Sequence, residues 1–138
     1  MKTALRTRTY NLHSRHNEPQ FAVEPGEEFI VQTELCTGDW LHRLEDTWSR
    51  DKNLGVNPAV CVAVEGARPG DMLAVHILDI TPDTLGYTGF DNLPLARSIA
   101  GHDWPLTVKT VAIKDGLIEW APGCALPAQP MLGVLGTA

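Results

Sequence analysis

Two Pro-Gly turns constrain the fold of this 138-residue chain more than any other feature of its sequence. The first spans residues 24–27 with the sequence Glu-Pro-Gly-Glu, and the second spans residues 68–71 with the sequence Arg-Pro-Gly-Asp. Proline presets φ at a turn's second position, and glycine accepts the positive φ that follows. Long patterns with helical spacing are scarce, so the turns favour short strands over helices.

Apolar runs between the turns supply the expected strands. Strands are predicted for residues 29–35, 59–64, 72–80, 107–113 and 117–120. In the third of these, Leu73, Val75 and Ile77 share one face. Asp115 and Gly116 predict a tight hairpin between the last two strands.

Two segments interrupt this strand pattern. Residues 38–55 place Leu41, Leu44 and Trp48 at helical spacing, which predicts a short helix within a long insertion. Residues 82–92 are predicted to form a Gly-rich loop. The whole pattern predicts a single, mainly β domain over residues 1–138, sandwich-like or jelly-roll-like, with a short helix or long loop insertion.

Composition and charge exclude several classes of function. The net charge of −6 argues against nucleic-acid binding through phosphate neutralisation. The apolar runs fall far short of the roughly 20 residues that a membrane-spanning helix needs. The N-terminus lacks the apolar region of a secretory signal, and the three cysteines show no Cys-x-x-Cys spacing. We therefore expect a cytoplasmic protein with reduced cysteines.

A series of segments carries a family resemblance. It comprises Val-Glu-Pro-Gly-Glu at 23–27, the run at 62–75 around Val-Glu-Gly-Ala-Arg-Pro-Gly-Asp, and the segments 77–80, 114–118 and 130–136. In this order they resemble the acetamidase/formamidase family of amide hydrolases. The resemblance runs over nearly all of this chain but covers only the N-terminal half of the family. Two departures are Leu35, where the family often has Asp, and Ala59-Val60-Cys61, where it usually has Thr-Gly-Pro.

The resemblance implies an activity and its requirements. It implies hydrolysis of the C–N bond of small linear amides such as formamide or acetamide. It also implies a divalent metal, zinc or calcium, and a homo- or hetero-oligomeric assembly. Since family members are about twice as long, the chain is expected to be a small subunit or N-terminal domain that a second protein chain completes.

Amide hydrolysis needs a nucleophile or an activated water and a group that stabilises the oxyanion. The sequence contains no Gly-x-Ser-x-Gly elbow and no His-Glu-x-x-His motif, which favours a metal-activated water. His13 and Arg15 resemble the family's N-terminal His-x-Arg segment, so His13 is the candidate base or metal ligand and Arg15 the candidate carbonyl-polarising group. Glu65 matches a family position and completes the predicted catalytic set. Ordinary surface roles remain the alternative for His13 and Arg15, and a hydrogen bond to the following turn remains the alternative for Glu65.

Two further groups of candidates are weaker. Asp39 and His42 would present two metal ligands on one face if the short helix formed. Thr88, Gly89 and Phe90 resemble a family loop whose backbone N–H groups would line the pocket for a small amide substrate.

Two other functions stay open at this point. The chain is also consistent with a non-catalytic β domain that serves as a binding or assembly module, which Leu35 and the half-length resemblance favour. Alternatively, the altered residues 57–61 would reshape the pocket for a related cyclic amide or imide.

Overall fold

The computed structural model describes residues 1–52, 57–90, 94–103 and 105–138. The chain divides into two compact units. Unit 1 comprises Met1–Asp39, Asn53–Asp79 and Leu132–Ala138, and unit 2 comprises Trp40–Lys52 and Ile80–Met131. Each unit has its own strand pairing.

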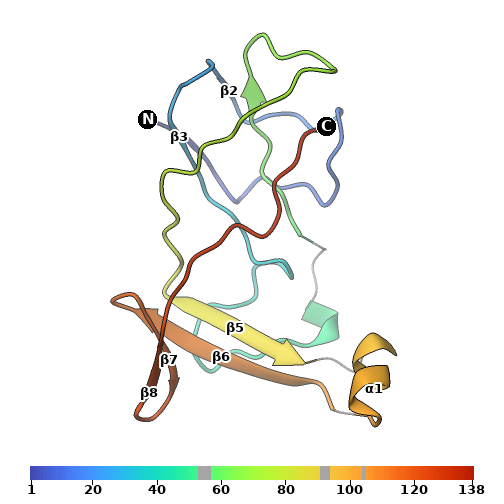
Figure 1. The fold of residues 1–138 in the computed structure, drawn as a ribbon, viewed down its shortest axis with the longest axis vertical. Coiled ribbons are helices and arrows are strands. Elements are labelled where there is room, and N and C mark those ends of the chain that lie inside the picture. Colours follow the sequence, from blue (N-terminus) through green and yellow to red (C-terminus); the bar gives the residue numbers. More distant parts are fainter. Residues whose placement is uncertain (53–56, 91–93, 104) are drawn as a thin grey trace. The chain divides into compact units, whose positions relative to one another are not determined.

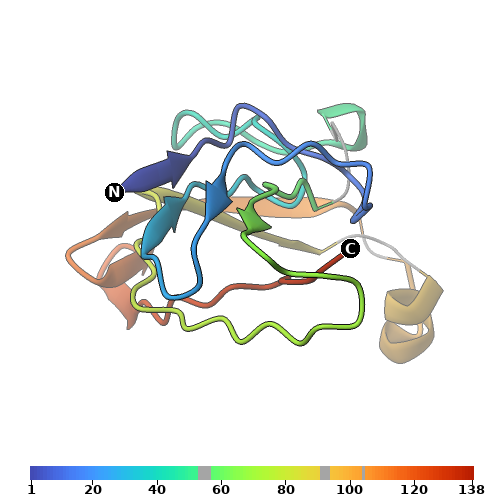
Figure 2. The ribbon, with the colours of Figure 1, turned by 90° about the horizontal axis from the view of Figure 1, so that it is seen from above.

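Unit 1 contains two pairs of very short parallel strands (Figures 1 and 2). β1 (Lys2–Ala4) pairs with β3 (Phe29–Val31), and β2 (Ala22–Val23) pairs with β4 (Ala63–Val64). Parallel neighbours need a long connection, so each pair joins segments that lie far apart in the sequence. The N-terminal third of the chain is thereby fastened to its middle.

Few side chains of unit 1 are buried. Ala4 of β1 and Val23 of β2 are its fully enclosed apolar residues among those described. The rings of Phe21 and Phe29 pack edge to face beside them, with centroids 6.2 Å apart. Ile30, in the middle of β3, stays exposed.

Both Pro-Gly turns form as predicted. In the first, the Glu27 amide donates to the Glu24 carbonyl at 3.0 Å. In the second, the Asp71 amide donates to the Arg68 carbonyl at 3.0 Å, and the Asp71 carboxylate accepts from the Arg68 amide at 2.8 Å. Gly26 and Gly70 have φ of 86° and 99°, which few other residues adopt.

Unit 2 is built on a four-stranded antiparallel sheet (Figure 1). The strands lie in chain order: β5 (Leu85–Phe90), β6 (Thr107–Lys114), β7 (Leu117–Ala121) and β8 (Cys124–Pro127). The predicted hairpin joins β6 to β7, because Asp115 and Gly116 take φ of 50° and 74°. A meander of this kind forms from neighbouring segments and needs no crossover.

Two short helices accompany the sheet of unit 2. They are the 3₁₀ turn η1 (Arg50–Lys52) and the helix α1 (Pro94–Ala100). No helix among the described residues has the length and apolar character needed to cross a membrane. The mainly β fold class is therefore confirmed, with a long loop rather than a helix over most of the predicted insertion.

The helix predicted around Leu41, Leu44 and Trp48 is wrong. The Asp46 carboxylate accepts hydrogen bonds from the amides of His42 and Arg43, both at 2.8 Å, which folds this segment into a turn. An Asp side chain that bonds nearby amides competes with the helical hydrogen-bond pattern. Three apolar residues at helical spacing did not outweigh that competition.

The Gly-rich loop predicted for residues 82–92 is also wrong over its described central part, which is strand β5. The backbone of β6 explains one glycine there: a Cβ on Gly89 would lie 3.0 Å from the carbonyl oxygen of Thr107. The glycine therefore marks a close approach of two strands and not a loop.

Residues 72–80, predicted as a strand, follow an outstretched course (Figures 1 and 2) but pair with no strand among the described residues. Their alternation is that of a strand, while the neighbours that would pair with it are missing among the described residues. The predicted strands 29–35 and 59–64 are likewise shortened to β3 and β4.

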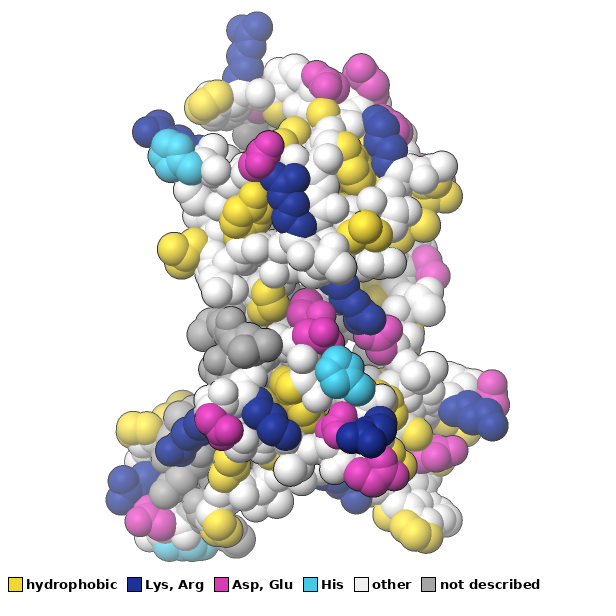
Figure 3. All heavy atoms as spheres, turned by 180° about the vertical axis from the view of Figure 1, so that it is seen from behind, with side chains coloured by type: hydrophobic (Ala, Val, Ile, Leu, Met, Phe, Trp, Pro, Cys, Tyr) yellow, Lys and Arg dark blue, Asp and Glu magenta, His cyan; other side chains and the backbone are white. Residues whose placement is uncertain are grey.

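The buried core is small for the length of the chain. Among the described residues only Ala4, Val23, Trp40 and Val111 are buried apolar side chains. The accessible surface is 10477 Å², whereas a compact monomer of this mass exposes about 7,100 Å² and two compact halves together about 8,500 Å². Apolar side chains accordingly reach the surface between charged ones (Figure 3).

Candidate functional site

The first candidate residues, His13 and Arg15, lie on a closed loop of unit 1. Its ends are joined by Asn17, whose side-chain amide donates to the Leu12 carbonyl at 2.7 Å. The Asn17 main-chain amide donates to the Ser14 carbonyl at 2.9 Å. A polar segment without regular secondary structure thus obtains its shape from local hydrogen bonds.

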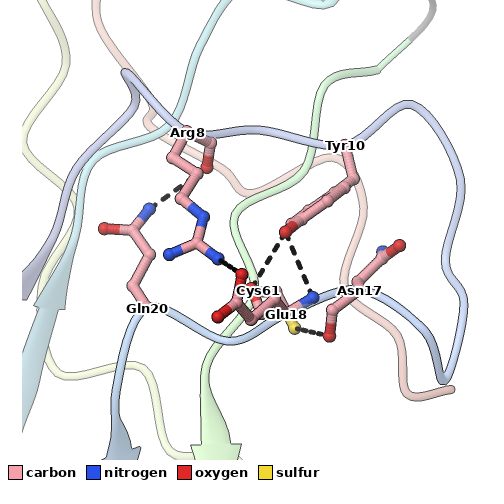
Figure 4. A network of polar contacts seen from close by, with 6 residues as sticks. All are labelled: Arg8, Tyr10, Asn17, Glu18, Gln20 and Cys61. Atoms are coloured by element: carbon pink, nitrogen blue, oxygen red, sulfur yellow. Dashed lines mark hydrogen bonds and ion pairs between the residues drawn. The ribbon is translucent and has the colours of Figure 1, made fainter.

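A network of side chains fixes the approach to this loop (Figure 4). Arg8 forms an ion pair with Glu18, and the Tyr10 hydroxyl donates to the Glu18 carbonyl and accepts from its amide, both at 3.1 Å. The main chain of Tyr10 exchanges two hydrogen bonds with Ala59, at 2.9 and 2.8 Å. The side-chain hydrogen bond that Arg8 donates to Tyr10, together with the Glu18 carboxylate, raises the pKa of Arg8.

Gln20 forms the other half of this network. Its side-chain oxygen accepts from the Leu5 amide at 2.8 Å, and its side-chain nitrogen donates to the carbonyls of Leu5 at 2.7 Å and Arg8 at 3.1 Å. Its main-chain amide donates to the Cys61 carbonyl at 3.0 Å. The loop that carries His13 is therefore anchored to the segment leading into β4.

His13 contacts the C-terminal segment of unit 1. A Cβ added to Gly136 would lie 2.7 Å from Nδ1 and 2.8 Å from Cε1 of the His13 ring. Real side chains do not come that close, so only glycine at position 136 leaves room for the ring in this place. The position of the imidazole thus depends on a residue more than 120 positions later in the sequence.

Arg15 and Glu65 are both exposed. Arg15 Nε donates a long hydrogen bond of 3.4 Å to Nε2 of His16. Glu65 follows β4 in a tight turn, where its amide donates to the Val23 carbonyl at 2.8 Å. Exposed groups of this kind can take up a ligand, but no hydrogen bond or ion pair that the structure describes joins the three predicted catalytic residues to one another.

The weaker candidates, Asp39, His42 and residues 88–90, do not lie on the loop that carries His13. Asp39 ends a stretch of unit 1, whereas His42 belongs to unit 2, and the helix that was to place them on one face is absent. Thr88, Gly89 and Phe90 lie in β5, where their backbones pair with Lys109, Val108 and Thr107 of β6. Because β5 is an edge strand, half of its amides still point away from the sheet.

A divalent metal would need several ligands in one place. Among the described residues no three His, Cys, Asp or Glu side chains lie close enough to hold an ion. The described residues alone therefore do not fit a complete metal site, and His13 offers at most one ligand of a set completed from elsewhere.

Known proteins resemble this chain in both sequence and fold. No family model matches the chain. A Schizosaccharomyces pombe protein provisionally named a formamidase is 27% identical over 141 residues, which cover 93% of this chain and 34% of that protein. The crystal structure of an acetamidase from Bacillus halodurans superposes with a TM-score of 0.84 at 30% identity, over 99% of this chain. This chain is similar to acetamidases and formamidases over part of their length.

A second crystal structure supports the same relationship. A predicted acetamidase/formamidase from Thermoanaerobacter tengcongensis superposes with a TM-score of 0.80 at 30% identity, over 96% of this chain. The acetamidase-like chain spans 46% and 44% of the two solved relatives and 34% of the curated one. That share is consistent with the predicted correspondence to the family's N-terminal half.

The residues that shape this site could not be predicted from the sequence. Tyr10, Glu18 and Gln20 bond partners eight or more positions away, and Gly136 contacts His13 from the far end of the chain. No local sequence motif predicts contacts between residues so far apart in the chain. The resemblance of residues 130–136 to the acetamidase family was the one signal that pointed to the segment of Gly136.

Proposed function

We propose that this chain supplies the N-terminal part of a hydrolase that cleaves the C–N bond of small linear amides such as formamide and acetamide. One observation carries the proposal: the backbone follows the Bacillus halodurans acetamidase over 99% of the chain at 30% identity. The shared fold alone would not be enough, because one fold serves many functions. The agreement of the named relatives on amide hydrolysis makes this activity the preferred one.

The chain accounts for less than half of each relative, so the activity is assigned to a larger assembly. We infer that hydrolysis requires the remaining family residues, from a second chain or from a continuation of this one. The small buried core supports this, since four buried apolar side chains among the residues that the structure describes are few for a chain of this length. A cytoplasmic, oligomeric enzyme is part of the proposal, and the three free cysteines agree with it.

The chain's own residues would act on the amide as follows. A water oxygen bonds to the amide carbon, and the C–N bond breaks as the leaving nitrogen takes up the proton that the base has removed from the water. The His13 imidazole accepts the proton of the attacking water, and the Arg15 guanidinium donates hydrogen bonds to the developing oxyanion. Glu65, exposed at the end of β4, provides a carboxylate that orients the amide nitrogen.

A divalent metal, zinc or calcium, belongs to the proposal as an untested requirement. When bound, such an ion would lower the pKa of a water molecule. As the alternative to its role as the base, His13 is the one described residue for which the family resemblance implies ligation, and further ligands would come from residues beyond those described. The metal content of the purified assembly, measured by mass spectrometry with and without His13→Ala, tests this independently of activity.

The activity is testable with a chimera. Residues 1–138 replace the matched 46% of the Bacillus halodurans acetamidase, and ammonia release from formamide and acetamide is measured. We expect hydrolysis by the chimera and none by the 138-residue chain alone. His13→Ala should lower kcat by about 100-fold or more, the usual contribution of a general base. His102→Ala, in unit 2, is the matched control and should leave kcat nearly unchanged.

Two results would contradict the proposal. Equal hydrolysis by the isolated chain would show that no further residues are needed. A folded chimera that releases no ammonia from either amide would favour the non-catalytic binding or assembly module.

A further inference from the structure

The segment 72–78 of unit 1 is exposed on both of its faces, and all of its residues except His76 are apolar. Met72 is 96% exposed, Val75 57% and Leu78 65%, and Leu73 and Ile77 are also exposed. Alternation places residues 73, 75 and 77 on one face and residues 72, 74, 76 and 78 on the other. A strand that is apolar on both faces is typical of the interior of a sheet.

Its backbone is equally unpaired. No backbone hydrogen bond joins residues 72–78 to another described residue, although the chain is extended there. Both edges of the segment are therefore open, whereas the interior strand β6 pairs along both edges. An extended apolar segment with two open edges is the part of a β protein most prone to accept another strand.

We propose that residues 72–78 form a docking strand for an apolar, extended segment of the family residues that this chain does not match. This inference rests on the proposed function. More than half of the Bacillus halodurans acetamidase lies outside the superposition, while 99% of this chain lies inside it. The docking strand belongs to the backbone that this chain shares with the acetamidase. The residues of the acetamidase outside the superposition are therefore the ones that can pair with it.

The charges at its ends argue against a second copy of this chain as the occupant. Self-pairing in antiparallel fashion about Val75 places Asp71 of each copy opposite Asp79 of the other. Directly opposed like charges destabilise a strand pair. The docking strand therefore fits an apolar segment whose flanking residues are basic or neutral.

Hydrogen exchange measured by mass spectrometry tests the docking directly. In the isolated chain the amides of residues 72–78 should exchange at nearly the rate of an unfolded peptide, because nothing protects them. In the chimera described above, the same amides should exchange at least about 100-fold more slowly. The hairpin of β6 and β7 is the internal control and should be protected in both proteins.

Charged variants separate docking from overall folding. Val75→Lys and Ile77→Lys should leave the urea midpoint of the isolated chain unchanged, because both side chains are already exposed. In the chimera each should reduce the protection of residues 72–78 by at least about tenfold. Leu12→Lys, at another exposed apolar position of unit 1, is the control and should not change it.

The outcomes are distinct from those of the activity assay. A chimera that protects the docking strand but hydrolyses no amide supports the docking and contradicts the proposed function. Protection of residues 72–78 in the isolated monomeric chain overturns the docking, and so does rapid exchange there in an active chimera. A chimera that does not fold also counts against it, since the relative's remaining residues then do not accept this chain. Protection that rises with the concentration of the isolated chain would assign the strand to self-association instead.

Discussion

At the scale of single residues, the contact of Gly136 with His13 is the most specific feature of the candidate site. The imidazole occupies the space that a Cβ at position 136 would need. Gly136 has no positive φ, so its lack of a side chain, and not its backbone freedom, is what the contact requires.

We expect Gly136→Ala to displace the His13 ring, because the added methyl group would lie 2.7 Å from Nδ1. The displacement should change the ¹H and ¹³C chemical shifts of the His13 imidazole in NMR spectra of the isolated chain. Gly133→Ala is the matched control, since nothing lies within 4 Å of a Cβ there. Unchanged His13 shifts in Gly136→Ala would show that the two residues are not in contact.

At the scale of elements, Asp46 determines the conformation of the segment that was predicted to be helical. Its carboxylate accepts the amides of His42 and Arg43, and its own carbonyl accepts the Thr110 hydroxyl at 2.8 Å. The two amide hydrogen bonds lower the pKa of Asp46 below its ordinary value. The folded state therefore favours the ionised carboxylate.

This shift predicts a pH dependence of stability. A group with a lowered folded pKa contributes stability above its unfolded pKa, near 4, and loses it as the pH falls through the folded pKa. Asp46→Asn should unfold at lower urea concentration than the wild type at pH 7, and the difference should shrink as the pH falls below about 4. Tryptophan fluorescence reports the transition, and Glu45→Gln is the control at the neighbouring acid. A difference that stays constant down to pH 3 would contradict the assignment.

The elements that sequence patterns predicted well are those with local causes. Asp115 and Gly116 define a turn whose two strands adjoin it, so the hairpin followed from four or five neighbouring residues. The alternation of residues 72–80 predicted an outstretched backbone, which the structure has. A strand also needs a partner to pair with, and local sequence does not reveal whether one is present. The glycines of β5 predict a loop when only their neighbours in the sequence are considered. The close approach of β6, which explains Gly89, is a tertiary contact that local sequence does not reveal. Of the candidate site, the family resemblance alone supplied His13, and the network around it had no local signal.

At the scale of the whole molecule, the large exposed surface sets how the chain unfolds. The unfolded chain exposes about 21,900 Å², so folding to 10477 Å² buries about 11,400 Å², against about 14,800 Å² for a compact monomer. Denaturant sensitivity is proportional to the surface that unfolding exposes.

The urea m-value of the isolated chain should therefore be about three quarters of that of a compact protein of equal length. Equilibrium urea denaturation followed by circular dichroism measures it, with sedimentation to show that the chain is monomeric. A monomer with the full m-value of a compact protein would mean that the chain buries more surface than this structure does. The chimera, with the docking strand covered, should show the larger m-value expected for its length.

The parallel pairing of β2 with β4 also has a consequence for how the protein is made. The paired residues of β2 and β4 are about forty positions apart in the sequence, and the paired residues of β1 and β3 are more than twenty-five positions apart. Closing such loops precedes any gain from the pairing, and folding slows as contacts become less local. A growing chain therefore carries β1 unpaired until residue 31 has emerged from the ribosome and β2 unpaired until residue 64 has emerged, whereas each hairpin of the four-stranded sheet forms as soon as it is synthesised. The segment that is made first is completed late.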